Sequence, residues 1–527
     1  MIDFDELDEL EAALEQAQLV SESCPAGKQV TDGDGNGCGA RLSYTNSGYS
    51  IPRSISERPP RKQDRTFMET QLQRDPPVYR DRQDFDAWQG RVLPGDATGV
   101  RLMHTLPLLQ QAGPEWLTAA FHAAGTLPLD NQVVAINELT PFEGGGAGLK
   151  AVLVVEYARS QPDLHTQLFV KLPHEQDQNH KYLIDAILNQ NKPEVDFARL
   201  LAHKMPFRVP KMYFADHCAR TSNFVLITEK VPFDVDGFEA AHDKYMDHKL
   251  PRPAHEYYFV LMRQLGRMVA AYKSGRLGRG LEASFPTESA VVATGHPSMM
   301  KAKVASMLKF AGEVAPQLMP RDVADHPTFL ASDAQTQIMH TSLYYQEMVD
   351  RMTANPDYVA YAHPNLNVDN AWWWADPDSK QLDCGVLDWG GFKSRPVAMH
   401  LQLSLFAGGC DLLDAHGDGL LATFVDECAK EGGPELCLEE LKLQYALALI
   451  GSVAGSSGTV GTIFRHTPRG EWASIRNRQD ARLEGRFLVR CYALGIFDLL
   501  TTWKRHGLYD TFSRWVEIAK LPLRSAA

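Results

Sequence analysis

The sequence lacks several features that define broad protein classes. No apolar run approaches the roughly 18 to 20 residues needed to cross a bilayer, so no membrane span is predicted. Residues 1–10 are acidic and lack the basic and apolar segments of a signal peptide. The eight cysteines form no CxxC pair, which favours reduced thiols. Together these absences predict a cytoplasmic protein without disulfides.

Basic charge is scarce as well. The 527 residues carry a net charge of −13 and the pI is near 5.8, which argues against nucleic acid as a partner. A nucleotide site is not excluded, because a local basic cluster can lie on an acidic protein. The composition, with 44% hydrophobic and 23% charged residues, is typical of a soluble globular protein. The length allows roughly two to four domains' worth of core.

The chain divides by composition into three parts. Residues 1–95 are predicted to form an N-terminal extension, because residues 22–63 are rich in Gly, Ser, Pro and Arg and are typical of a disordered tail. The acidic helical pattern at its start leaves two interpretations open, a frayed terminus or a docking element for a protein partner. Residues 97–232 contain most of the predicted strands, and residues 233–527 are mainly helical in pattern.

Strands and helices follow from hydrophobic periodicity. The predicted strands of the second part lie at 133–136, 149–157, 168–172 and 224–229, with an amphipathic helix at 192–203. In the third part, helical patterns occupy 400–450 and 479–520, and a short strand pair lies between 371 and 388. This order predicts an α+β fold with a small β-rich N-lobe and a large, mainly helical C-lobe.

Two features of the predicted N-lobe suit phosphate binding. Gly144, Gly145 and Gly146 lie in a turn between two strands, where backbone N–H groups can approach phosphate oxygens; an ordinary hairpin turn is the other interpretation. Lys171 lies in an apolar strand and needs a partner, which a nucleotide phosphate and Glu194 of the next helix would provide. A lysine at a solvated strand edge is the alternative.

A more specific pattern lies in the predicted C-lobe. His363, Asn365 and Asn370 belong to one short loop, and Asp388 follows an apolar strand. Asn370 offers a carbonyl oxygen and Asp388 a hard carboxylate, the ligand types that Mg²⁺ prefers. A histidine at such a loop start holds the loop by hydrogen bonds. An asparagine-rich turn between strands is the structural alternative.

In this order, over about residues 130 to 450, these motifs resemble the aminoglycoside-phosphotransferase and choline-kinase-like superfamily, and most closely its ecdysteroid-kinase-like branch. The segments that carry the resemblance are the glycine-rich turn, Leu168–Pro173, Pro193–Phe197, Val209–Tyr213, Phe224–Glu229, His363–Asn370 and Val386–Trp389. The resemblance implies a bilobal protein-kinase-like fold.

The resemblance also implies roles for single residues. Lys171 would contact the α- and β-phosphates of ATP with Glu194 as its ion-pair partner, and Asn370 and Asp388 would bind Mg²⁺. The segment from Thr228 to Val231, including Glu229, would form the hinge and present backbone groups to adenine. These are the expected cofactor-binding and metal-binding residues.

Asn365 stands where the family carries its catalytic aspartate. An amide is a far weaker proton acceptor than a carboxylate, yet it can still orient a hydroxyl, and general-base help is worth roughly 10² to 10⁴ in rate. Asp369 is near in sequence and is expected to point away from the metal. The sequence therefore predicts an ATP- and Mg²⁺-dependent phosphotransferase acting on a hydroxyl of a small molecule, with His363, Asn365 and Asp388 as catalytic residues. The alternative is a pseudokinase that binds nucleotide or a protein partner without efficient turnover.

Overall fold

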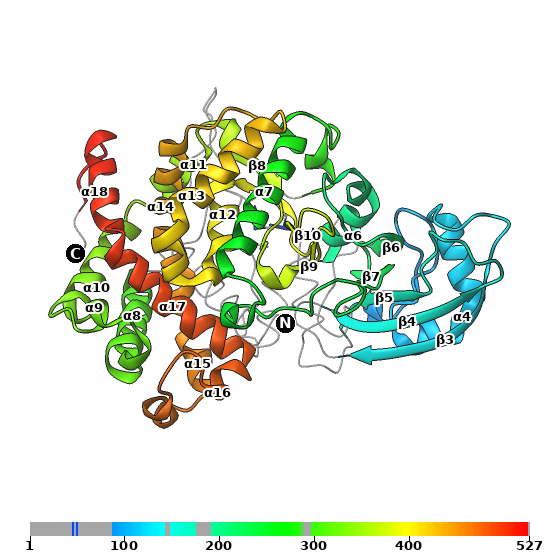
Figure 1. Cartoon of the computed structure of the whole chain (residues 1–527), viewed down its shortest axis with the longest axis horizontal. Helices are drawn as coiled ribbons and strands as arrows, with labels where there is room; N and C mark the ends of the chain where they lie inside the picture. Colours follow the sequence, from blue (N-terminus) through cyan, green and yellow to red (C-terminus); the bar gives the residue numbers. More distant parts are fainter. Residues whose placement is uncertain are drawn as a thin grey trace, which may run out of the picture.

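The computed structural model describes residues 45–46, 49–50, 87–142, 148–174, 191–285, 287 and 297–524. The predicted glycine turn at Gly144, Gly145 and Gly146, and most of the predicted extension 1–95, lie outside these ranges. In Figure 1 a sheet and one helix lie at one end of the molecule, and the helices of the C-terminal half lie at the other end. Two strands of two residues each, β1 (Thr45–Asn46) and β2 (Tyr49–Ser50), pair antiparallel and precede them in sequence.

The N-lobe is built on one antiparallel sheet of five strands in the order β3-β4-β5-β7-β6. The strands are β3 (Val133–Phe142), β4 (Leu149–Tyr157), β5 (Gln167–Leu172), β6 (Met212–Cys218) and β7 (Asn223–Glu229). Helix α6 (Asn191–Leu200) separates β5 from β6 in the sequence. The strands predicted from apolar runs are all present, whereas β6 was not predicted as a strand.

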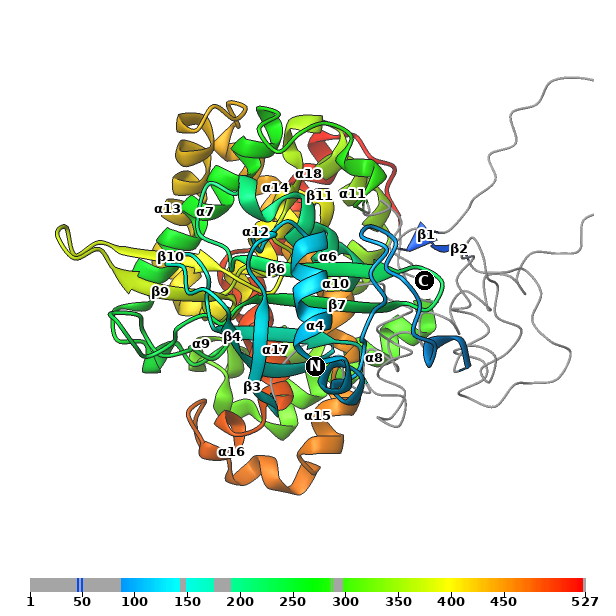
Figure 2. The same cartoon turned by 90° about the vertical axis from the view of Figure 1, so that its right-hand side faces the viewer.

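The two faces of this sheet are covered by different helices. Helix α4 (Leu106–Ala123) lies across one face, where Trp116 and Phe121 pack against the aromatic side chains of β6 (Figure 2). On the other face, Val195 of α6 packs against Phe224 and Leu226 of β7. Because side chains alternate between the faces of a strand, each strand contributes to both layers. The face toward α6 is the one that carries Lys171, which pairs there with Glu194 of α6.

The C-lobe is a helical assembly around one large hydrophobic core. Its helices are α7 (Ala254–Lys273), α8 (Pro297–Lys309), α9 (Arg321–Ala324), α10 (Ala334–Ser342), α11 (Tyr345–Thr353), α12 (Val397–Leu405), α13 (Gly409–Lys430), α14 (Leu438–Gly458), α15 (Val460–His466), α16 (Ala481–Glu484), α17 (Phe487–Arg505) and α18 (Leu508–Ile518). Helices α7 and α13 approach closely at Gly266, where a Cβ would lie 2.9 Å from the Phe424 carbonyl oxygen. Among the residues described, no single helix has the length and hydropathy to cross a membrane, and α14 with α15 would qualify only as a pair bent by 44°.

Two short two-stranded sheets are set into the helical lobe and carry the candidate site. Strand β8 (Val359–Ala362) pairs with β11 (Lys393–Pro396), and β9 (Ala371–Ala375) pairs with β10 (Leu382–Val386), all antiparallel. Trp372 and Trp373 of β9 are buried, and Trp372 lies against Gly385 of β10, where a Cβ would overlap the indole ring. These buried tryptophans pack beneath two connections, the loop between β8 and β9 and the turn after β10.

Candidate active site

Lys171 and Glu194 form a buried ion pair between the sheet and α6. The Lys171 Nζ lies 2.5 Å from the Glu194 Oε2, and the side chains are only 3% and 10% exposed. Lys171 lies on β5, and Glu194 lies in the first turn of α6. A lysine with so little access to water needs a close anion, and Glu194 provides it. The pairing expected from the sequence is the one that the structure contains.

The loop from His363 to Asn370 is organised around the buried His363 ring. Its Nε2 lies 3.0 Å from the Leu387 carbonyl oxygen, and its Nδ1 accepts a hydrogen bond from the Asn365 N–H at 3.1 Å. Burial lowers the pKa of His363 to about 4, so the ring is neutral with its proton on Nε2. His363 therefore joins the start of the loop to the strand end that precedes Asp388.

Three asparagines then fix the shape of the loop. The Asn370 Nδ2 donates to the Asn365 carbonyl oxygen at 2.7 Å, and the Asn367 Nδ2 donates to the Asn365 Oδ1. The Asn367 N–H also donates to the Asn365 carbonyl oxygen, at 3.0 Å. Asn365 is thus the centre of the loop's hydrogen bonds. Because the amide nitrogen of Asn370 is used inside the loop, its Oδ1 is directed away from that bond.

Asp388 lies at the turn after β10, next to the Lys171–Glu194 pair. The Leu387 N–H donates to the Asn370 carbonyl oxygen at 3.0 Å, which ties this turn to the loop. A Cβ built on Gly390 would lie 3.7 Å from both the Asp388 Oδ1 and the Glu194 Oε2. The carboxylates of the two lobes therefore meet around Gly390. Asp388 itself has φ of +62°, a left-handed conformation that side-chain-bearing residues seldom adopt and that is common at functional sites.

The two neighbouring carboxyl groups have pKa values shifted in opposite directions. Burial opposes ionisation of Asp388, but the positive charge of Lys171, to which Lys150 adds, outweighs it and holds the pKa of Asp388 below its usual value. Burial raises the pKa of Glu194, and the Asp388 charge adds to that rise against the opposing effect of Lys171. Asp388 is therefore the carboxylate that keeps its charge most readily.

An aromatic stack connects α6 with the Asp388 turn. The Phe197 ring of α6 is stacked on Trp389 with centroids 3.7 Å apart and an interplanar angle of 12°. Trp389 also contacts the His363 ring edge-on, with centroids 4.7 Å apart. Offset-stacked and edge-to-face pairs add stability beyond area burial. The helix that carries Glu194 is in this way packed against the turn that carries Asp388.

The predicted hinge residues lie where β7 ends and the chain passes to the C-lobe. The Glu229 Oε2 lies 3.0 Å from the His165 Nε2, and the Lys230 N–H donates to the Gln167 carbonyl oxygen at 3.1 Å. Val231 is buried. Glu229 and Lys230 therefore contact the start of β5 and the residues just before it, and neither contact is with Lys171. Their role toward adenine remains a prediction.

Asn370 and Asp388 are the residues that could hold a divalent cation. The described residues contain no group of three or more His, Cys, Asp or Glu side chains arranged to bind a metal. A site with an amide oxygen and one carboxylate still fits Mg²⁺, which keeps several waters and takes phosphate oxygens from its substrate. The donor set therefore suits Mg²⁺ bound together with a nucleotide.

Sequence reasoning missed two lysines near the site. Lys150 of β4 lies opposite Lys171 of β5, a relation that drawing the hairpin register would have indicated. The Lys244 Nζ lies 3.6 Å from the Asp369 Oδ2, so Asp369 forms an ion pair within the C-lobe. The Lys244 carbonyl oxygen accepts a hydrogen bond from the buried Arg490 at 2.9 Å. No local pattern connects Lys244 with Asp369, because only tertiary packing brings them together.

Comparison with solved structures gives weak similarities to phosphotransferases and kinases. A macrolide 2'-phosphotransferase type I is 15% identical, with a TM-score of 0.34, covering 70% of this chain and 96% of its own. A microcompartment-associated aminopropanol kinase is 13% identical, with a TM-score of 0.35, covering 73% and 97%. A choline/ethanolamine kinase family protein from Mesorhizobium loti is 14% identical, with a TM-score of 0.33, covering 72% and 98%.

No protein-family model matches the sequence, and no curated protein matches it either. By their names, the solved structures are of the kind that the motifs resemble, and none of those named is an ecdysteroid kinase. The likeness is loose, so the site is interpreted from this chain's own geometry. With its five-stranded sheet, its Lys171–Glu194 pair and its His363–Asn370 loop beside Asp388, the chain has the predicted bilobal α+β fold, a small β-rich N-lobe and a large, mainly helical C-lobe.

Proposed function

We propose that the protein is an ATP- and Mg²⁺-dependent phosphotransferase that acts on a hydroxyl of a small molecule. The observation that carries the proposal is the meeting of three groups from two lobes. Lys171 and Glu194 come from the N-lobe, Asp388 comes from the C-lobe, and both carboxylates approach Gly390. A phosphoryl transfer depends mainly on positioning and on charge stabilisation, and this arrangement supplies both.

Each residue has a role in the proposed reaction. Lys171, held by Glu194, binds the α- and β-phosphates, and the glycine turn at Gly144, Gly145 and Gly146 covers them. Asn370 and Asp388 would hold Mg²⁺, which would supply positive charge against the phosphate groups of the nucleotide. The hinge from Thr228 to Val231, Glu229 included, receives the adenine.

The acceptor side of the reaction is assigned to the loop. The hydroxyl oxygen of the acceptor forms a bond to the γ-phosphorus of ATP. The bond from that phosphorus to the oxygen that bridges the β- and γ-phosphates breaks, and ADP leaves with that oxygen. Asn365 accepts a hydrogen bond from the acceptor hydroxyl and aligns it. Its amide does not take up the proton, which passes to solvent or to the transferred phosphoryl group. His363 keeps the loop in place through its bond to the Leu387 carbonyl oxygen.

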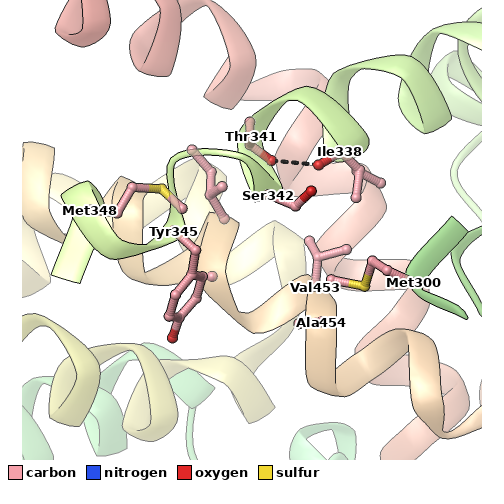
Figure 3. Close-up of a pocket in the computed structure, with 10 residues that line it drawn as sticks. Met300, Ile338, Thr341, Ser342, Tyr345, Met348, Val453 and Ala454 are labelled. Carbon is pink, nitrogen blue, oxygen red and sulfur yellow. Dashed lines mark hydrogen bonds between the residues drawn. The ribbon is translucent and has the colours of Figure 1, made fainter. Parts of the chain in front are cut away.

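A pocket in the C-lobe is too small to receive an acceptor. It lies between α8, α10, α11 and α14 and is lined by Met300, Ile338, Met348 and Val453 among others (Figure 3). The Thr341 hydroxyl donates to the Ile338 carbonyl oxygen within α10, at 2.9 Å (Figure 3). Its volume of about 10 Å³ suits roughly one water molecule. The acceptor is therefore expected beside the loop and not in this pocket.

The decisive test compares two matched substitutions on β10 and its turn. Asp388→Asn removes the charge of the proposed metal ligand without changing its shape, and Asp383→Asn makes the same change at a residue bonded to Gln264. With ATP, Mg²⁺ and a panel of hydroxyl metabolites, Asp388→Asn should lower ADP formation at least about 10³-fold, since a metal ion contributes several kcal/mol to such transition states. Asp383→Asn should leave it near the wild-type rate.

Two results would contradict the proposal. One is an Asp388→Asn variant as active as the wild type. The other is a wild-type protein that neither consumes ATP with any acceptor nor gains thermal stability from ATP and Mg²⁺. Stabilisation by ATP and Mg²⁺ without turnover would instead favour the pseudokinase alternative, for which the neutral side chain of Asn365 is the specific observation.

A further inference from the structure

Two lysines face each other across the strands β4 and β5. In the antiparallel register Lys150 lies directly opposite Lys171. Residues in this relation project to the same face with Cβ atoms roughly 4.5 to 5.5 Å apart, and like charges so placed repel. A sheet gains nothing from such a pair by itself. The arrangement is favourable only where negative charge lies between or beside the two ammonium groups.

Both lysines lie on the sheet face that carries the candidate site. Their neighbours Ala151 and Val170, which alternate with them, are buried in the core under α4. Side-chain alternation therefore directs Lys150 and Lys171 toward α6. The charge of Lys150 acts on Glu194 and also on Asp388, lowering the pKa of each carboxyl group. Lys150 is thus in electrostatic contact with the carboxylates of both lobes.

The backbone just before β4 lies very close to the end of β5, two residues before Lys150. Gly148 has φ of +85°, and a Cβ on it would lie 2.5 Å from the Leu172 carbonyl oxygen. Its N–H donates to the His174 Nε2 at 2.9 Å. Only glycine fits this close approach, which fixes where the strand begins. Lys150, two residues on, therefore has a defined position relative to Lys171.

We propose that Lys150 is a second phosphate-binding lysine, which binds the β- and γ-phosphates of the nucleotide beside Lys171. The inference rests on the proposed function and adds a residue that no motif assigned. Lys171 is already committed to Glu194 at 2.5 Å, so its charge is largely offset before a nucleotide arrives. Lys150 balances the remaining carboxylate, Asp388, and keeps the site from repelling a polyphosphate. It makes the site selective for nucleoside di- and triphosphates over monophosphates.

The test measures how affinity depends on the number of phosphates. Lys150→Met removes the charge and keeps most of the aliphatic stem, and Lys150→Arg keeps the charge. Lys211→Met is the matched control, because the Lys211 Nζ lies 3.6 Å from Asp163 and over the Tyr213 ring, away from Glu194. Dissociation constants for ATP, ADP and AMP, each with Mg²⁺, are measured by titration calorimetry on the full chain.

Lys150→Met should weaken ATP and ADP binding about 10- to 100-fold, the range of one charge-assisted hydrogen bond, while AMP binding changes little. Lys150→Arg should keep most of the affinity, and Lys211→Met all of it. Circular dichroism and the melting temperature without ligand report whether each variant is folded. If Lys150→Met does not fold, the same comparison is made with Lys150→Gln against Lys150→Arg.

The results separate this inference from the proposed function. Wild-type binding of ATP with Lys150→Met equal to Lys211→Met would overturn the role of Lys150 and leave the phosphotransferase proposal intact. An equal loss for ATP and AMP would also overturn it, because the lysine would then act on the whole site. A wild-type protein that binds none of the nucleotides would refute the proposed function itself, and the lysine's role with it.

Discussion

The N-lobe half and the C-lobe half of the candidate site hold their polar groups in different ways. In the N-lobe, Lys171 and Glu194 are opposite charges in direct contact, 2.5 Å apart and buried. In the C-lobe loop, Asn365 and Asn370 have neutral side chains, and the Asn370 Nδ2 donates to the Asn365 backbone carbonyl oxygen. The acidic residue of this loop, Asp369, has its Oδ2 3.6 Å from the Lys244 Nζ.

Under the proposed function, this difference would separate nucleotide binding from hydroxyl activation. The N-lobe half contains a buried charge pair, and such a pair is costly to remove from water. The loop half would align the acceptor hydroxyl, with an amide and no carboxylate at Asn365. The proposed function therefore assigns binding and turnover to different residues, and the following substitutions test that assignment.

The largest effect is expected from breaking the N-lobe pair. Lys171→Met leaves the Glu194 carboxyl buried without its partner, and removing one member of such a pair typically costs about 3 kcal/mol or more. The free energy of unfolding, measured with urea at pH 7, should fall by that amount. The double variant Lys171→Met/Glu194→Leu should recover most of it, because no buried charge is left.

The same break in the C-lobe provides the contrast. Lys244→Met leaves Asp369, whose pair with Lys244 is longer and whose side chain is 17% exposed. A looser pair with some access to water contributes less, so the loss should be about 1 kcal/mol. Equal losses in the two lobes would contradict the distinction drawn between them.

A smaller effect, on rate and not on stability, is expected at Asn365. Asn365→Asp restores a carboxylate at the loop centre, and an aspartate oxygen can still accept the hydrogen bond from the Asn367 Nδ2. General-base help should raise kcat about 10²-fold, at the low end of its usual range. The affinity for ADP should stay within about twofold, because the proposed function gives Asn365 no contact with the nucleotide or with Mg²⁺.

Single-turnover kinetics with ATP and a responsive acceptor would measure this change. Asn355→Asp is the matched control, since Asn355 lies in an exposed turn and its Oδ1 accepts a bond from the Asp357 N–H that an aspartate keeps. If Asn365→Asp leaves kcat at the wild-type value, hydroxyl activation does not depend on this position, and Asn365 has a purely structural role.

The sequence predicted the N-lobe well because its signals are local. Apolar runs gave β4 at its observed bounds and gave β5 and β7 to within one residue. The partner of Lys171 was also predictable. A lone charge on an apolar strand needs a partner, and Glu194 of the next helix was the acid expected for it. Strand β6 was missed, since its run from Met212 contains Asp216 and His217 and does not read as apolar.

Features that depend on register and tertiary packing could not be predicted in the same way. Lys150 becomes a neighbour of Lys171 only when the β4–β5 register is known. Lys244 and Asp369 meet because the buried Arg490 of α17 holds the Lys244 backbone. Long-range pairs of this kind have no signature within a sequence window.

Asp247 offers the smallest of the expected effects, a pH-dependent contrast with Asp388 inside the C-lobe itself. Asp388 keeps a low pKa because lysines lie near it, whereas burial raises the pKa of Asp247 to about 7, reinforced by the charges of Asp369 and Asp498. Both of its carboxylate oxygens are buried without a hydrogen bond, although the Tyr258 hydroxyl is close. Ionisation of Asp247 therefore destabilises the folded protein.

The sign of the pH dependence follows from that raised pKa. Between about pH 4 and pH 7 the folded state holds a proton on Asp247 that the unfolded state has lost, so the stability contributed by this group falls as the pH rises toward 7. Asp247→Asn removes the titration. Its gain in unfolding free energy over the wild type should be about 2 kcal/mol larger at pH 8 than at pH 5. Asp243→Asn, at a side chain that is 66% exposed beside Arg490, is the matched control for the substitution itself, and parallel curves for Asp247→Asn and the wild type would mean that Asp247 is ionised across this range.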